Sequence, residues 1–170
     1  MTRARIMYNM TVREVREGLR ETQTVLLPLG VVEQHGYHLL LSTDIHNAQE
    51  IAARASVETG CFVAPCVHYS FSGGTLPGTI NITPQVFSLV VMDILRSLLA
   101  QGFRHVVILL GHGGPENVVA ANDAALMFQR LRPPRRPASP FRSSPSGSSR
   151  PPTAVPLRRA TFTPGATRPR

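Results

Sequence analysis

The sequence predicts an α/β domain built on a mostly parallel sheet. Short apolar segments of strand length alternate with longer segments of helical periodicity along residues 1–131. The strand segments lack the apolar–polar alternation of a half-exposed strand, which indicates strands covered on both faces. Strands that alternate with helices favour parallel pairing through right-handed crossovers.

The first expected elements lie within the first sixty residues. A helix begins at Thr11, because Thr11 and Glu14 have the spacing of a capping box, and it runs to about Glu21. The apolar segment 24–32 is the first buried strand. Asp44 is expected to cap the second helix, whose apolar residues keep helical spacing as far as a terminating glycine.

The following elements repeat the pattern. Residues 61–67 form a second short buried strand, and Thr83-Pro84 opens the third helix as an N-cap followed by a first-turn proline. The third strand covers residues 105–110, and a last helix begins at Pro115 after a glycine-rich turn. We expect six apolar residues to form one face of the third helix: Val86, Leu89, Val90, Ile94, Leu98 and Leu99.

The composition changes abruptly near Leu131, where we expect the domain to end. Residues 132–170 hold nine arginines, ten prolines and six serines but no acidic residue, whereas residues 1–131 hold nine arginines and ten acids. A segment of this composition cannot bury enough apolar surface to offset its chain entropy, so we expect a disordered tail. Two interpretations stay open: a cationic arm for nucleic acid or acidic lipid, or, as we favour, a truncated or out-of-frame end without selected function.

The same composition excludes several classes of protein. The net charge of +8 belongs to the tail, so the domain carries no broad basic face. No apolar segment approaches the roughly 20 residues that span a bilayer, and no signal-peptide core follows Arg3 and Arg5. Cys61 and Cys66 would point to opposite faces of one strand, so we expect no disulfide between them and a cytoplasmic protein.

Acidic and imidazole side chains follow the strands. Glu33 and His35 come directly after the first strand, Asp44 lies at the next helix start, and His112 lies in the turn after the third strand. Ligands bind at the carboxyl ends of strands in such sheets, so we expect the four side chains to converge there. Carboxylates and imidazoles are typical metal ligands. A lone histidine is more often structural, so spacing alone leaves a metal site and a structural cluster as alternatives.

Three segments resemble signatures of the creatininase (creatinine amidohydrolase) family. Residues 27–44 are similar to the first signature, Leu76-Pro77-Gly78-Thr79-Ile80 to a Phe-Pro-Gly-Thr-Ile segment, and residues 102–114 to the region of an Asn-Gly-His-Gly-Gly turn. They occur in the family's order within about residues 7–130. The resemblance implies a three-layer α/β/α sandwich, usually assembled as a homohexamer.

The resemblance also implies a two-metal hydrolase, with zinc and a second zinc or manganese, that cleaves C–N bonds of small amides or cyclic amides. By position, Glu33 and His112 would bind one ion and His35 the other, while Asp44 would bridge both. The resemblance assigns no proton donor in this chain.

The chain departs from the family pattern at several positions. Leu110 stands where the family turn begins with Asn, and Gly114 stands where some members carry a further carboxylate ligand. Glu116 is an additional candidate for that ligand. Family members continue with a ligand-bearing second half, and nothing after Leu131 resembles it. We therefore expect a creatininase-type amidohydrolase or, alternatively, an inactive truncated fragment of one; nucleic-acid binding through the tail is the least favoured alternative.

Overall fold

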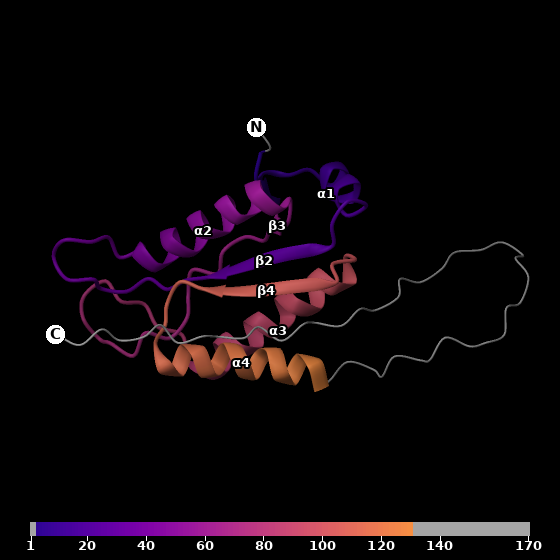
Figure 1. Ribbon diagram of the computed structural model, residues 1–170. Helices are drawn as coiled ribbons and strands as arrows, with labels where there is room; N and C mark the ends of the chain where they lie inside the picture. The colour runs from indigo at the N-terminus through magenta and orange to yellow at the C-terminus, as the bar shows by residue number, and fades with distance from the viewer. Residues whose placement is uncertain (1–2, 131–170) are drawn as a thin grey trace, which may run out of the picture.

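The computed structural model describes residues 3–130, and a four-stranded sheet lies at its centre (Figure 1). The strands are β1 (Arg5–Ile6), β2 (Thr24–Leu29), β3 (Phe62–Val63) and β4 (His105–Leu110), in the spatial order β1-β3-β2-β4. All three pairings are parallel, which confirms the α/β class predicted from the alternation of elements. The predicted disorder of residues 132–170 concerns a part of the chain outside the described residues.

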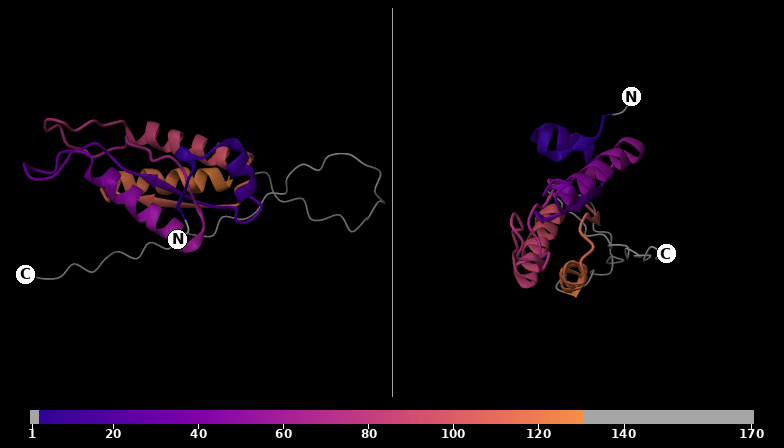
Figure 2. Two further views of the ribbon diagram at one scale, coloured as in Figure 1. Left: turned by 90° about the horizontal axis from the view of Figure 1, so that it is seen from above. Right: turned by 90° about the vertical axis from the view of Figure 1, so that its left-hand side faces the viewer.

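Helices cover both faces of the sheet. A 3-10 turn, η1 (Met7–Asn9), precedes α1 (Val12–Gly18), and the longer helices are α2 (Thr43–Thr59), α3 (Pro84–Ala100) and α4 (Pro115–Arg130). Helices α1 and α2 lie on one side of the sheet and α3 and α4 on the other, as the right-hand view of Figure 2 shows. Among residues 3–130, no helix has the length and apolar character needed to cross a membrane.

The predicted capping box is present at the start of α1. The Thr11 side chain accepts a hydrogen bond from the Glu14 backbone N–H, and the Glu14 carboxylate accepts one from the Thr11 backbone N–H over 2.6 Å. The helix ends at Gly18 rather than near Glu21. The chain tightens there into a turn in which the N–H groups of Glu21 and Thr22 both donate to the Gly18 carbonyl.

β4 has the predicted bounds, 105–110, whereas β2 and β3 are shorter than the apolar segments that predicted them. β2 ends at Leu29, and β3 holds only two residues. Pro65 has no backbone N–H to donate to a ladder, so pairing beyond β3 is reduced to single contacts with the β2 segment. In one of them the Val67 N–H donates to the Pro28 carbonyl over 3.1 Å. β1 was not predicted because two residues are too few to show a periodicity.

The predicted face of α3 is half right. Of the six residues expected there, Leu98 is buried, Ile94 and Leu99 are half-buried against the core, and the other three are exposed. Packing against the sheet and α4 instead buries five residues: Phe87, Val91, Met92, Leu95 and Leu98. Because α3 is apolar around most of its circumference, helical spacing fits more than one face, and tertiary packing selects between them.

Two glycines bring the start of α2 close to the sheet. Gly30 directly follows β2, and Gly111 directly follows the neighbouring strand β4. A Cβ at Gly111 would lie 2.1 Å from the Asp44 carbonyl oxygen, and one at Gly30 would lie 2.8 Å from the Ile45 Cα. These are backbone atoms that cannot rotate away, so the close packing requires glycine. The first turn of α2 therefore rests directly on the carboxyl ends of β2 and β4.

This contact predicts different effects for two glycines of one turn. Gly111→Ala should lower the free energy of unfolding by about 1–3 kcal/mol, the usual range for overpacking a filled site. Gly113→Ala is the matched control, because no atom lies within 4 Å of a Cβ added there. Urea unfolding followed by circular dichroism measures both variants. Equal unfolding midpoints would contradict the proposed role of the Gly111 contact.

Candidate metal centre

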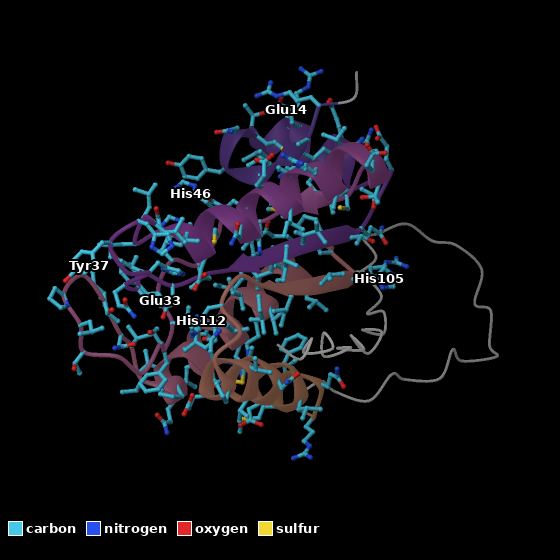
Figure 3. All side chains as sticks on the ribbon, turned by 60° about the vertical axis from the view of Figure 1, so that its left-hand side comes forward. Glu14, Glu33, Tyr37, His46, His105 and His112 are labelled. Carbon is cyan, nitrogen blue, oxygen red and sulfur yellow. The ribbon has the colours of Figure 1, made fainter. Side chains whose placement is uncertain are left out.

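Four polar side chains meet at the carboxyl edge of the sheet. Glu33 and His35 lie in the segment after β2, Asp44 lies in the first turn of α2, and His112 lies in the turn between β4 and α4. Figure 3 shows Glu33 and His112 close together, although they come from separate segments of the chain. The structure thus brings together the four residues that strand-end positions single out.

Asp44 lies between the two imidazoles. Its Oδ1 is 3.2 Å from His35 Nε2, and its Oδ2 is 3.0 Å from His112 Nδ1. Glu33 Oε1 is 3.1 Å from His112 Nδ1 and 3.7 Å from His35 Nε2. Potential ligand atoms of Glu33, His35 and Asp44 all lie within 4.8 Å of one another, which is close enough for a shared metal ion.

The prediction that Asp44 caps α2 is wrong. The N-cap is Ser42, which makes no side-chain capping bond, and Asp44 is the second residue of the helix. Its two carboxylate oxygens face His35 and His112 instead of a backbone N–H group. A carboxylate in the first turn is still stabilised by the helix dipole, which favours negative charge at this end.

The cluster is largely shielded from solvent, with side-chain exposures of 10% for Asp44, 13% for His112, 15% for Glu33 and 18% for His35. Burial raises the pKa of Asp44 above its ordinary value, and the adjacent Glu33 carboxylate raises it further, while the two imidazoles lower it. Two carboxylates this close repel each other when both are ionised. A bound cation would relieve this repulsion.

The donor set fits a divalent metal ion. Two carboxylates and two imidazoles are ligands that zinc and manganese accept. His112 directs Nδ1 at the carboxylates, while its Nε2 is buried without a hydrogen-bond partner among residues 3–130. A purely structural histidine would be expected to have both ring nitrogens satisfied at this depth. The two adjacent carboxylates, which face Nδ1 rather than this nitrogen, are what favours a bound cation over a structural cluster.

Two further residues near the turn after β4 were candidates or departures in the sequence: Glu116 is not joined to the cluster in the described part of the chain, and Gly114 lies against His112. Glu116 is exposed in the first turn of α4, and no hydrogen bond or ion pair of the described residues joins it to the four. A Cβ at Gly114 would lie 2.5 Å from His112 Nε2, so a side chain at this position would require the ring to move. Gly114 thus leaves room for the observed imidazole position.

Two supporting residues were not identified from the sequence. The Ser72 hydroxyl donates to Glu33 Oε2, and Asn117, which is 1% exposed, donates from Nδ2 to the His112 carbonyl over 3.1 Å. Asn117 could have been noticed in the sequence, because it is the one polar residue on the buried face of α4, which is formed by Asn117, Ala120, Ala121, Ala124 and Phe128. Ser72 had none, because its contact depends on how two loops meet.

The family model for creatininase, described as creatinine amidohydrolase, matches residues 8–155. The chain belongs to the creatininase family. A creatinine amidohydrolase of Pseudomonas putida is 30% identical over 95 residues, 52% of this chain and 36% of that protein. A mycofactocin precursor peptide peptidase of Mycolicibacterium smegmatis is 34% identical over 113 residues, 62% of this chain and 45% of the relative.

A 3-dehydro-scyllo-inosose hydrolase of Thermotoga maritima is 27% identical over 124 residues, 71% of this chain and 40% of the relative. The chain thus spans less than half the length of these curated relatives.

Solved creatininases share the fold. The crystal structure of creatinine amidohydrolase gives a TM-score of 0.70 at 24% identity and covers 75% of this chain and 51% of that one. A mutant creatininase of the Zn–Zn type gives 0.66 at 27% identity and covers 76% and 54% of the two chains. A manganese form is also among these structures, with a TM-score of 0.70. The neighbours therefore include both a two-zinc and a manganese form.

Replacing Asp44 by Asn tests the charge balance of the centre. A pKa raised in the folded state favours folding only at low pH, and that contribution is lost as the pH rises through the folded pKa. Above the folded pKa, the ionised Asp44 therefore destabilises the metal-free fold, so metal-free Asp44→Asn should there be at least as stable as the wild type.

Zinc should raise the melting temperature of the wild type, because an ion that binds only the folded state stabilises that state. The rise should be far smaller in Asp44→Asn, which lacks one of the proposed ligand carboxylates. Thermal denaturation with zinc or with EDTA measures both effects. Asp93→Asn, which alters an exposed carboxylate on α3, should keep the wild-type zinc shift. The same zinc shift in Asp44→Asn would count against the site.

Proposed function

We propose that this chain carries the metal centre of a creatininase-type amidohydrolase, and that Glu33, His35, Asp44 and His112 hold two divalent ions, zinc with zinc or manganese. The observation that carries the proposal is the convergence of these four shielded side chains from three segments. Membership of a family with zinc and manganese structures supports it.

The geometry also supports a division of roles. The two oxygens of Asp44 face different imidazoles, Oδ1 towards His35 and Oδ2 towards His112, as a carboxylate that bridges two ions would. Glu33 Oε1 is nearer to His112 than to His35, which favours pairing Glu33 with His112 at one ion. His35 then serves the other ion together with Asp44.

Bound ions at this place would polarise a carbonyl group and lower the pKa of a water molecule. The role of the four side chains would be to hold the ions in place. Low exposure of the four side chains keeps bulk water away and strengthens their electrostatic interactions. None of them is free to be assigned as the donor of a proton to the leaving nitrogen.

We propose a small amide or cyclic amide as the substrate class, cleaved at its C–N bond. Three relatives are named for creatinine, a precursor peptide and 3-dehydro-scyllo-inosose, so the common element is hydrolysis rather than one substrate. A mutant creatininase solved with creatine gives a TM-score of 0.66 at 26% identity. Creatinine and the peptide contain C–N bonds of this class, whereas the inosose contains no nitrogen, so the relatives together support hydrolysis and leave the substrate open.

We further propose that the protein acts as a cytoplasmic homo-oligomer and that residues 1–131 form a partial creatininase-like α/β domain. Large apolar side chains are exposed in this single chain, and those that lie together on the surface would favour association: Tyr37, Leu40, Leu76, Leu89 and Val119.

A second candidate is a chain that binds metal without turnover. It is favoured by one observation among the described residues, that none of the four side chains that would hold metal is free to donate a proton to the leaving nitrogen. Nucleic-acid binding through residues 132–170 rests on composition alone and is not favoured.

The test is an assay of the full chain after metal removal and reloading with zinc or manganese. Release of ammonia or amine from creatinine and from a panel of small amides is measured, together with metal binding by calorimetry. Metal-dependent turnover should fall about 100-fold or more in Glu33→Gln, because losing a ligand should cost at least as much as losing a group that supports one.

Glu58→Gln, on an exposed residue of α2, is the control and should keep wild-type turnover. Metal binding without turnover would favour the second candidate. An absence of metal binding would contradict the proposal itself.

A further inference from the structure

The loop of residues 70–82, between β3 and α3, lies against the segment that carries Glu33. Both loops extend from the same edge of the sheet, as Figures 1 and 2 show. The Ile80 N–H donates to the Val32 carbonyl over 2.9 Å, and the Gln34 N–H donates to Thr79 Oγ1 over 3.1 Å. The loop therefore holds the backbone on both sides of Glu33.

The same loop reaches the Glu33 carboxylate. The Ser72 hydroxyl donates to Glu33 Oε2, while Oε1 is directed at His112 Nδ1. The terminal torsion of a glutamate is broad, so the carboxylate of a free side chain samples many orientations. A hydrogen bond to one oxygen selects the orientation in which the other oxygen faces the centre.

Ser72 is itself held by Asn81. Asn81 Oδ1 accepts hydrogen bonds from the backbone N–H groups of Ser72, over 2.8 Å, and Gly73, over 3.3 Å. Asn81 Nδ2 donates to the Gly74 carbonyl over 2.7 Å. One amide side chain thus fixes three consecutive residues of the loop, including the one that contacts Glu33.

We propose that Ser72 is a positioning residue for Glu33 and that Asn81 holds Ser72 in place, so that this loop sets the affinity of the centre for divalent ions. The proposal rests on the proposed metal-binding function of Glu33. Hydrogen bonds that orient a ligand are a recognised determinant of metal affinity. The same loop also hydrogen-bonds to the backbone of Val32 and Gln34, the two neighbours of Glu33. The effect on metal affinity should therefore act through Glu33 and not through the other ligands.

The test measures zinc and manganese binding to metal-free protein by titration calorimetry. Ser72→Ala should raise the dissociation constant about 10–100-fold, the usual effect of removing a group that orients a ligand. Ser72→Thr keeps the hydroxyl and should bind close to the wild-type value. Asn81→Ala should weaken binding in the same direction but less. Thr75→Ala, on an exposed residue of the same loop, is the control and should bind as the wild type does.

Melting temperatures distinguish a positioning role from a purely structural one. If Ser72 positions Glu33, the metal-free melting temperature of Ser72→Ala should stay near that of the wild type, while the rise caused by metal becomes smaller. If Ser72 is only structural, the metal-free melting temperature falls and the metal affinity is unchanged, and this result would overturn the proposal. Unchanged affinity in Ser72→Ala would also overturn it and leave the proposed function intact. If Ser72→Ala does not fold, unchanged affinity in Asn81→Ala decides against it. A wild type that binds no metal would overturn both proposals.

Discussion

The contact between the first turn of α2 and the ends of two neighbouring strands governs the arrangement of the candidate centre. Gly111 meets the Asp44 backbone and Gly30 meets that of Ile45, at separations that leave no space for a Cβ. The contact places Asp44 over the point where β2 and β4 end. Since the chain leaves β2 towards Glu33 and His35, and leaves β4 towards His112, all four side chains are delivered to one place.

The electrostatics of the cluster follow from this crowding. Two carboxylates and two imidazoles share a shielded site, and the pKa of Asp44 is raised by burial and by the Glu33 carboxylate. A bound cation would relieve this repulsion, while hydrogen bonds from Ser72 to the Glu33 carboxylate and from Asn117 to the His112 carbonyl hold the cluster from outside. If the four side chains hold metal as we propose, the centre would be less stable without the ion than with it.

The sequence predicted those features that depend on local pattern. The Thr11 capping box could be predicted from the spacing of Thr11 and Glu14. The convergence of Glu33, His35, Asp44 and His112 could be predicted because ligands bind at the carboxyl ends of strands in such sheets. Features that depend on tertiary packing could not be predicted. The buried face of α3 could not be read from a helix that is apolar nearly all round, and Asp44 resembled a helix cap because capping and ligation use the same side chain at a helix start.

The central claim is that these four side chains hold metal, and a crystal structure of the protein grown with zinc tests it most directly. Anomalous scattering at the zinc absorption edge locates the ions independently of any expectation. The account predicts anomalous peaks about 2 Å from carboxylate oxygens of Asp44 and Glu33 and from ring nitrogens of His35 and His112. Zinc bound elsewhere, with these four side chains still joined only to one another, would contradict it.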